Sequence, residues 1–366
     1  MSVSTTDSIA GFALHRRSDP RSDADREAIL AAPGFGKHFT DHLARAHWTR
    51  EGGWSDLRVE AYGPLQLDPA AAVLHYAQEI FEGLKAYRHA DGSVWSFRPE
   101  KNAARFARSA RRLALPELPE ESFLGSLEAL VGVDNAWVPS GGETSLYLRP
   151  FMFASESFLG VRPAHAVDYL LIASPAGAYF SGGVKPVSIW LSQEYSRAAP
   201  GGTGAAKCGG NYAASLLAQS EAFEHGCDQV AFLDAIEHRW VEELGGMNLY
   251  FVYDDGSVLT PPTSGTILEG VTRDSILTLL GESGHTVREE KLDIADWRAD
   301  AASGRLVEVF ACGTAAVVTP VGKLVEPGAE HPTSGTGEVT MSIRQSLLDI
   351  QYGRAEDTHG WLHRLV

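Results

Sequence analysis

The chain has 366 residues, of which 44% are apolar and 21% are charged. This composition is typical of a soluble globular protein, and the length is too great for one small core, so two domains are expected. The formal net charge of -16 argues against a surface that binds nucleic acid or an anionic membrane.

No apolar run reaches the length of a membrane span, and the N-terminus lacks the apolar core of a signal peptide. A cytoplasmic location is therefore expected. The three cysteines, Cys208, Cys227 and Cys312, cannot all pair and show no C-x-x-C spacing. The histidines are scattered without a ligand pattern, so neither a disulfide framework nor a metal site is predicted.

The first part of the chain predicts an arm followed by strands and a helix. Residues 1–32 are polar without periodicity and are expected to form a loosely attached arm. Gly83 to Arg88 and Val94 to Phe97 flank an Asp-Gly turn and predict a β-hairpin. Pro99 fits the first turn of a helix that carries Arg105. The arginines of this helix form either a solvated face or an anion contact.

The run from Ser145 to Phe153 alternates polar and apolar residues, as a half-buried strand does. Tyr147 and Arg149 therefore lie on the same face of the predicted strand. An arginine beside a tyrosine can clamp a carboxylate. A surface salt bridge is the alternative.

A second strand precedes the predicted domain boundary. Val167 to Ala173 is apolar, and the residues after it have the glycine-rich composition of a connector, which we place at 177–187. Residues 33–176 and 188–366 are then the two domains. A new set of strands begins at Val187.

A single lysine stands among small residues in the stretch Gly201 to Tyr212. Glycine has no Cβ, so this backbone can let a ligand approach closely. The ε-amine of Lys207 becomes a nucleophile when its pKa falls, and it then forms Schiff bases with carbonyl compounds or pyridoxal phosphate. A flexible loop with a solvated lysine is the alternative. A phosphate-binding loop is disfavoured, because Cys208 follows the lysine and no glycine directly precedes it.

Three further features follow the lysine. Asn211 is a predicted N-cap of a helix that ends near His225. Glu243 lies in an apolar stretch of strands, where a carboxylate is costly to bury without a partner. Thr272 is a predicted helix N-cap, and residues 312–316 form a turn of small residues. Both of these could present free amides to an anion.

This combination matches the needs of pyridoxal phosphate. The cofactor takes a lysine for its Schiff base, a carboxylate that keeps its pyridine nitrogen protonated, and a cup for its phosphate.

Several long runs resemble branched-chain amino acid aminotransferases, in the expected order along the chain. The runs are Phe35 to His42, Leu74 to Tyr87, Ser145 to Pro150, Gly201 to Tyr212, Met247 to Leu249 and Ile267 to Arg273. The resemblance implies the α/β (α+β) architecture of fold type IV, with a small N-terminal α/β domain at 33–176 and a larger, barrel-like domain at 188–366. It further implies pyridoxal 5'-phosphate between the domains and a homodimer.

The activity that the resemblance implies is reversible transfer of the amino group between L-leucine, L-isoleucine or L-valine and 2-oxoglutarate. Lys207 matches the Schiff-base lysine, Tyr212 the tyrosine that contacts the cofactor's phenolic oxygen, and Glu243 the partner of the pyridine nitrogen. The residues that match the phosphate cup are Arg105, Val271, Thr272 and Thr314. Those that match the substrate pocket are Phe81, Tyr147, Tyr179 and Ala315, with Arg149 as partner of the glutamate side chain and Tyr76 and Val161 supplied by the other subunit.

Two positions depart from the family pattern. Mammalian relatives carry a C-x-x-C where this chain has Ala316 and Thr319, so a thiol switch is excluded there. A threonine common before the Met-Asn-Leu run is Gly246 here, which predicts a larger or looser pocket.

The sequence disfavours three alternative functions. D-Amino acid aminotransferase and aminodeoxychorismate lyase share the fold, but the Tyr147-x-Arg149 clamp argues against both. A non-enzymatic nucleotide-binding protein would not need Lys207 beside Tyr212.

Overall fold

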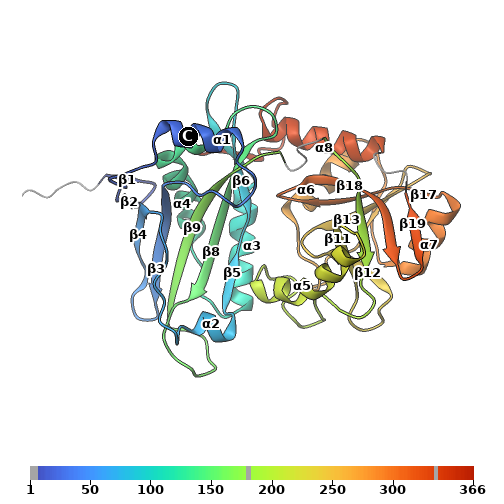
Figure 1. The fold of residues 1–366 in the computed structure, drawn as a ribbon, viewed down its shortest axis with the longest axis horizontal. Helices are drawn as coiled ribbons and strands as arrows, with labels where there is room; N and C mark the ends of the chain where they lie inside the picture. Colours follow the sequence, from blue (N-terminus) through green and yellow to red (C-terminus); the bar gives the residue numbers. More distant parts are fainter. Residues whose placement is uncertain (1–6, 179–182, 334–336) are drawn as a thin grey trace, which may run out of the picture. The chain divides into compact units, whose positions relative to one another are not determined.

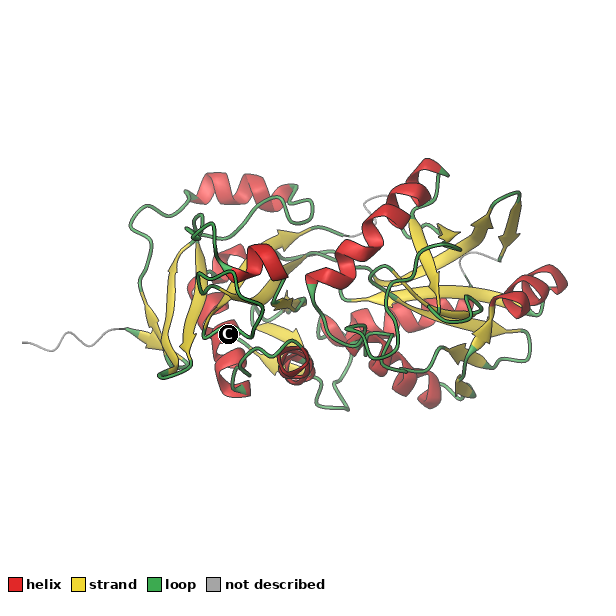
Figure 2. Cartoon of the chain, turned by 90° about the horizontal axis from the view of Figure 1, so that it is seen from below, coloured by secondary structure: helices red, strands yellow, loops and turns green. Residues whose placement is uncertain are grey.

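The structure is a computed structural model, and it describes residues 7–178, 183–333 and 337–366. The chain divides into two compact units (Figure 1). Unit 1 comprises Met1–Ser181 and Ile350–Val366, and unit 2 comprises Gly182–Asp349. Each unit is built on its own β-sheet, with helices packed against it (Figure 2). The expected α/β class is confirmed.

Unit 1 contains helices and a mostly antiparallel sheet. Its strands are β1 Ser8–Ile9, β2 Phe12–Leu14, β3 His42–Thr49, β4 Gly53–Ala61, β5 Glu79–Phe81, β6 Leu84–Arg88, β7 Val94–Phe97, β8 Ser145–Ala154, β9 Ala166–Ala176 and β20 Leu362–Arg364. Its helices are α1 Asp23–Ala31, α2 Ala72–Tyr76, α3 Pro99–Arg112 and α4 Glu120–Val133, with a 3-10 turn at Asn135–Trp137.

The sheet of unit 1 has the order β1-β2-β4-β3-β9-β8-β6-β7-β20, and β5 pairs with β8. Helices α3 and α4 cover it through aromatic side chains. Phe106 of α3 packs on Phe123 of α4 and on Tyr169 of β9, with ring centroids 5.5 and 5.8 Å apart. The predicted hairpin is confirmed as β6 and β7, and the helix does begin at Pro99.

The ends of the chain differ from expectation. From residue 7 on, the expected arm is built into unit 1, because β2 pairs with β4 and the backbone N–H of Arg17 donates to Nε2 of the buried His42 at 2.8 Å. The last residues, expected in the second domain, belong to unit 1. The cause is β20, which pairs with β7 in antiparallel register, Leu362 opposite Phe97.

Within its described residues, unit 2 has a mixed sheet and four helices. Its strands are β10 Val187–Leu191, β11 Gln229–Leu233, β12 Trp240–Leu244, β13 Asn248–Tyr253, β14 Val258–Thr260, β15 Val287–Glu289, β16 Leu292–Asp293, β17 Leu306–Gly313, β18 Val317–Glu326 and β19 Ala329–Pro332. Its helices are α5 Gly209–Glu224, α6 Val271–Glu282, α7 Ile294–Ser303 and α8 Glu338–Gln351, whose last two residues lie in unit 1.

The sheet of unit 2 curls back on itself. Its order is β15-β14-β13-β17-β18-β10-β11-β12-β16, with β19 on β18. The edge strands β15 and β16 are separated in sequence only by Glu290 and Lys291, so the two edges of the sheet must lie near each other. This arrangement is consistent with the expected barrel-like domain.

Alternation along the strands gives unit 2 two apolar layers. Val230 and Phe232 of β11 pack with Ala218 and Ala222 of α5. Ala231 and the other inward residues of β11 face the opposite way and join the large core that holds Trp297 of α7. Residues i and i+2 share a face of a strand, which is why one short strand serves both layers. No helix of the described residues is long and apolar enough to cross a membrane.

Candidate active site

The glycine-rich stretch leads directly into α5. Lys207 comes just before the N-cap Cys208, and its Nζ donates to the hydroxyl of Tyr212, in the first turn of α5, at 2.7 Å. The predicted N-cap Asn211 is wrong, since the helix already begins at Gly209. The Asn211 amide instead turns back and donates to the carbonyls of Thr203 and Ala206, both at 2.8 Å. This residue therefore holds the loop that carries the lysine.

Gly204 shows why the loop needs a small residue. A Cβ at this position would overlap the backbone of Thr266, at 2.4 Å from its carbonyl oxygen. The lysine loop therefore lies directly against the segment before α6.

Glu243 is buried in β12, with an exposed fraction of 2%. Its Oε1 accepts from the backbone N–H of Leu268 at 2.8 Å, and its Oε2 accepts from the amide of Asn248 at 3.1 Å. Burial raises the pKa of Glu243 to about 7, against the opposing charge of Arg197. The carboxyl group therefore titrates close to neutral pH.

Arg197 is the partner that the sequence analysis did not identify. Its Nη1 lies 2.8 Å from Oε1 of Glu243, and both side chains are almost fully buried. The same nitrogen also donates to the carbonyl of Thr266 at 3.0 Å. A buried Glu243 carboxylate needs a cationic partner, because burial of an unpaired charge is costly. The position of Arg197 just before the glycine-rich stretch was the available sequence signal for this partner.

The turn between β12 and β13, residues 245–247, brings the remaining parts together. A Cβ at Gly246 would lie 3.7 Å from the ring of Tyr212, and one at Gly313 would lie 3.3 Å from Cγ of Met247. A Cβ at Gly270 would overlap the side-chain oxygen of Asn248. The lysine helix, the start of α6 and the turn after β17 therefore meet around this one turn.

Two of these parts can bind an anion. Helix α6 begins at Val271 with Gly270 as N-cap, so the prediction that Thr272 is the N-cap is wrong by two residues. The first N–H groups of a helix have no intrahelical acceptor, and the helix dipole favours an anion there. Thr314 and Ala315 form the turn between β17 and β18. The start of α6 lies close to Asn248, as Gly270 shows, and the turn after β17 lies close to Met247, as Gly313 shows.

Unit 1 carries a second cluster. The prediction that Tyr147 and Arg149 share a face of β8 is confirmed, because Nη2 of Arg149 donates to the Tyr147 hydroxyl at 3.1 Å. The guanidinium lies 4.8 Å from the ring centre of Phe81, and Phe35 packs edge-on against Tyr147. The Nε of Arg149 is shielded from solvent and has no hydrogen-bond acceptor among the described residues. A carboxylate ligand would supply one.

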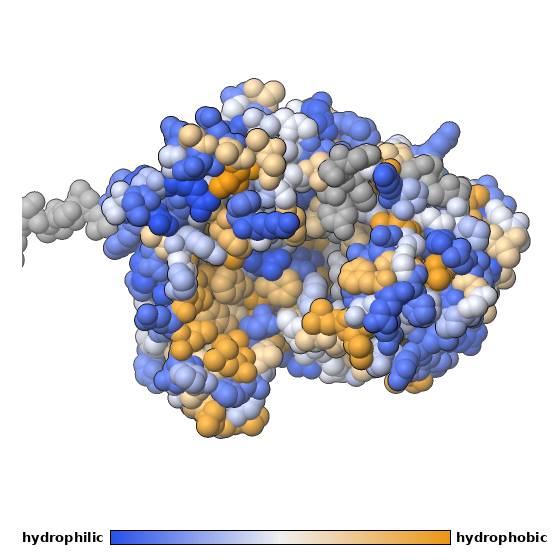
Figure 3. All heavy atoms as spheres, in the orientation of Figure 1, coloured by the Kyte–Doolittle hydropathy of each residue, from blue (hydrophilic) through white to orange (hydrophobic). Residues whose placement is uncertain are grey.

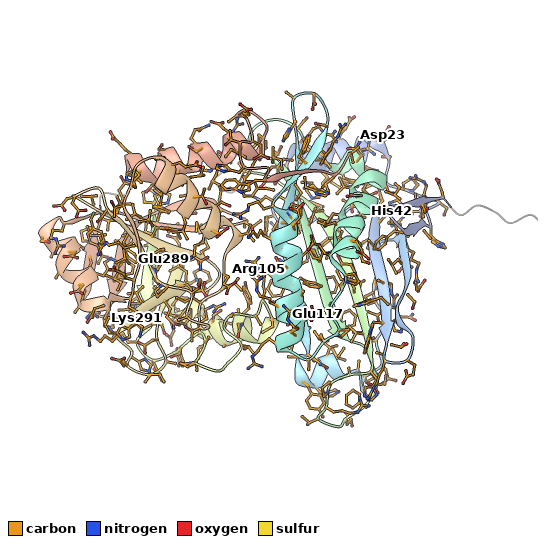
Figure 4. The ribbon with its side chains drawn as sticks, turned by 180° about the vertical axis from the view of Figure 1, so that it is seen from behind. Asp23, His42, Arg105, Glu117, Glu289 and Lys291 are labelled. Atoms are coloured by element: carbon orange, nitrogen blue, oxygen red, sulfur yellow. The ribbon has the colours of Figure 1, made fainter. Side chains whose placement is uncertain are left out.

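Arg105 lies in unit 1, on α3, as Figure 4 shows. It makes a bidentate pair with Glu82, with Nε and Nη2 at 2.7 and 2.8 Å from the two carboxylate oxygens. Tyr76 donates to the carbonyl of Leu159 at 2.5 Å, and Val161 is 88% exposed. The predicted contacts of these residues with phosphate or substrate stay predictions, and Tyr179 lies outside the described residues.

Within the described ranges 7–178, 183–333 and 337–366, no group of three or more His, Cys, Asp or Glu side chains is arranged to hold a metal ion.

The chain matches the family model described as amino-transferase class IV over residues 79–324. It is 61% identical to the probable branched-chain-amino-acid aminotransferase of Streptomyces coelicolor, over 96% of this chain and 98% of that protein. It is 59% identical to the branched-chain-amino-acid aminotransferase of Mycolicibacterium smegmatis, over 97% and 98%.

Among solved structures, the T.th. branched-chain amino acid aminotransferase with pyridoxamine 5'-phosphate is similar, with a TM-score of 0.72 and 29% identity over 88% of this chain and 99% of that one. The same enzyme has also been solved with N-(5'-phosphopyridoxyl)-L-glutamate and with 4-methylvaleric acid.

Proposed function

Because the chain belongs to the class IV aminotransferases, we propose that it transfers the amino group between branched-chain amino acids and 2-oxoglutarate, with pyridoxal 5'-phosphate as cofactor. The observation that carries the proposal is the amine of Lys207, which is held by the Tyr212 hydroxyl next to the turn that follows β12, the strand of the buried Glu243. A protein that only binds nucleotides has no use for this arrangement.

The residues of unit 2 fit the cofactor. Lys207 would hold it covalently, Glu243 would pair with its protonated pyridine nitrogen, and the anion-binding turns at Thr272 and Thr314 would hold its phosphate. When bound, the cofactor supplies an electron sink that stabilises a carbanion at the α-carbon of an amino acid. Of these proposed contacts, the one between the buried Glu243 carboxylate and the pyridinium ion would be the strongest, because burial strengthens the interaction between opposite charges.

The chain's own residues would move the proton. The Lys207 amine, once free, is the base that takes the α-proton, and the hydrogen bond to Tyr212 orients it. Arg197 and Asn248 hold the Glu243 carboxylate in place. Arg105 is proposed as a phosphate contact, although it is engaged with Glu82.

Substrate selection is proposed for the cluster of unit 1. Phe81 and Tyr147 offer apolar surface to an aliphatic side chain, and Arg149 offers a charge to the second carboxylate of glutamate. Ala315 and Tyr179 are proposed as further substrate contacts. The related T.th. enzyme, solved with a phosphopyridoxyl-glutamate and with 4-methylvaleric acid, supports one pocket for both kinds of substrate.

We also propose a cytoplasmic homodimer. Several large apolar side chains of unit 1 are exposed, and the space-filling view shows apolar surface around α2 (Figure 3). The most exposed are Leu74 at 59%, Leu159 at 65% and Val161 at 88%. A second subunit would cover them, and Tyr76 and Val161 would then reach its site. Light scattering on the purified protein should give twice the chain mass of 39.5 kDa; a mass of one chain would exclude the dimer.

The function is tested at Lys207. Borohydride treatment of the purified holoenzyme should fix the cofactor on this lysine, as peptide mass spectrometry would show. Lys207→Ala should bind the cofactor without a covalent bond and lose nearly all turnover of leucine, because it lacks both the attachment point and the base. Detection of the cofactor mass on another lysine would exclude the assignment.

A further inference from the structure

Unit 2 contains a pocket of about 230 Å³ that the proposed function does not use. It lies between the end of β11, the strand β12, the segment before α6 and the residue that precedes β16. Its lining residues include Ile236, Trp240, Glu242, Pro261, Thr266 and Lys291. None of the residues proposed to hold the cofactor is among its lining residues.

Glu242 is the first unusual feature of this pocket. Only 6% of the residue is exposed. Its Oε1 accepts from the hydroxyl of Thr266 at 2.5 Å, but its Oε2 has no hydrogen-bond donor among the described residues. A buried carboxylate oxygen without a donor is costly, so it indicates a missing partner. The terminal torsion of a glutamate is soft, so the carboxylate can turn this oxygen towards the pocket.

Lys291 is the second feature, and Figure 4 labels it. Its Nζ lies 5.2 Å from the ring centre of Trp240. In the parts of the chain that the structure describes, it makes no ion pair, with Glu242 or with any other residue. Among the charged residues that line this pocket, Glu242 and Lys291 thus carry opposite charges without pairing with each other. A ligand that carries both charges would satisfy both.

The rest of the pocket wall is partly apolar, and it also contains Asp234 and Glu237. Both carboxylates already have donors, because Asp234 accepts from the backbone N–H groups of residues 236, 237, 239 and 240, and Glu237 accepts from Nε1 of Trp240. Ile236 is 72% exposed, and Trp240 and Pro261 line the same pocket. Pockets for drug-sized ligands measure roughly 300–1,000 Å³, so this one suits a smaller molecule. Aliphatic surface on the ligand would cover Ile236.

From these observations we infer that the pocket binds a small zwitterionic aliphatic amino acid, with its ammonium group on Glu242, its carboxylate on Lys291 and its side chain against Ile236 and Trp240. This site is separate from the catalytic one. Side chains alternate along a strand, so Glu242 and Glu243 leave β12 on opposite faces. The inference stands independently of the proposed activity.

Calorimetry on the borohydride-reduced holoenzyme tests it, because the reduced protein can no longer react with amino acids at Lys207. The probes are L-leucine, 3-methylbutylamine, which lacks the carboxylate, and 4-methylpentanoate, which lacks the ammonium group. Leucine should bind saturably and more tightly than either single-charge analogue.

Variants at the two charged residues should affect the binding of the two single-charge analogues in opposite ways. Glu242→Gln should weaken leucine and the amine roughly ten- to a hundredfold and leave the acid unchanged, since a charge-assisted hydrogen bond is lost. Lys291→Met should weaken leucine and the acid and leave the amine unchanged. Glu224→Gln and Lys323→Met, at positions away from the pocket, are matched controls.

Lys291 is exposed, so its variant is expected to fold even if Glu242→Gln does not. The inference is overturned if leucine shows no saturable binding to the reduced enzyme. It is equally overturned if Lys291→Met and Ile236→Ser both bind leucine as the wild type does.

Discussion

Arg197 is the neighbouring residue that most favours the ionised form of Glu243. Burial raises the pKa of this carboxyl group, and the Arg197 guanidinium at 2.8 Å opposes the shift. Without Arg197 the pKa would rise further, so the carboxyl group would be protonated at neutral pH and could no longer balance a pyridinium ion. Arg197 is therefore a positioning residue, which acts on the reaction only through Glu243.

Arg197→Met should raise the pKa of Glu243 further, because an opposite charge at this distance lowers a carboxyl pKa by roughly 1–3 units. The acid limb of the leucine half-reaction, followed by the cofactor's absorbance, should move to higher pH by about that amount. Arg197→Lys should restore part of the shift, which a purely structural role would not produce. Arg298→Met, at a partly exposed pair with Glu326, is the control and should leave the profile unchanged. An unshifted profile in Arg197→Met would refute the role.

Arg149 should discriminate between the two substrates. Only glutamate brings a second carboxylate, and loss of one charge-assisted hydrogen bond costs roughly 1.5–3 kcal/mol. Arg149→Met should therefore reduce kcat/KM for glutamate about ten- to over a hundredfold and largely spare leucine. The two half-reactions can be measured separately by stopped-flow absorbance. Equal losses would mean that Arg149, which also packs on Phe81, only supports the fold of β8.

Among the elements, β12 has two roles because its side chains alternate. Glu243 faces the proposed cofactor site, whereas Glu242 lines the pocket on the other side. One strand of five residues thus presents two carboxylates to two different environments. Thr266 contacts both sides, since its hydroxyl bonds Glu242 and its carbonyl bonds Arg197.

Helix α8 depends on a buried carboxylate at its start. Glu308 accepts from the backbone N–H groups of Val339 and Thr340 and from the Thr340 hydroxyl. A Cβ at Gly337 would overlap the Glu308 side chain. Gly337→Ala should therefore destabilise the protein by roughly 1–3 kcal/mol, the usual cost of overpacking.

Urea denaturation measures this loss, and Gly281→Ala in α6 is the matched control. Nothing lies within 4 Å of a Cβ at Gly281, so this change should stabilise the protein by about 0.5–1 kcal/mol. If both variants shift the urea midpoint in the same direction, the capping role of Glu308 is wrong.

For the whole molecule, the path of the C-terminus matters. The chain leaves unit 2 after α8 and ends in unit 1 as strand β20. His363 of this strand contacts Glu100 of α3 at 2.8 Å and Glu128 of α4 at 3.0 Å, one through each ring nitrogen. Only the protonated imidazole can donate to both carboxylates. The hydrogen bond to Glu100, and to a smaller extent the one to Glu128, raises the pKa of His363. Burial of the ring opposes this shift.

A raised pKa in the folded state adds stability that is fully present below the unfolded value of about 6.5 and is lost as the pH rises through the folded value. His363→Gln should therefore destabilise the protein by about 0.5–1 kcal/mol at low pH, since the ring is partly exposed, and hardly at alkaline pH. Denaturation across this pH range would show it. His285→Gln is the control, because among the described residues the ring of His285 hydrogen-bonds the carbonyl of Gly256 and not a carboxylate. A constant loss for His363→Gln at all pH values would contradict the prediction.

The sequence by itself determined the local features. The turn residues at 91–92 specified the hairpin, Pro99 specified a helix start, and strand alternation placed Tyr147 beside Arg149. The lysine among small residues and the carboxylate in an apolar strand indicated pyridoxal phosphate chemistry as a set, and the longer runs that resemble branched-chain amino acid aminotransferases identified the family. These inferences depend on neighbours in the chain, which a sequence displays directly.

Only the tertiary structure decided which distant groups meet. Arg197 and Glu243 are far apart in sequence, and although Arg197 lies just before the glycine-rich stretch, no local pattern pairs it with this carboxylate. Asn211 has the composition of an N-cap, but its bonds to Thr203 and Ala206 fix the loop instead. The placement of β20 in unit 1 is likewise a long-range pairing. Such contacts are set by the packing of whole sheets, where burial and hydrogen bonding between remote segments outweigh local propensity.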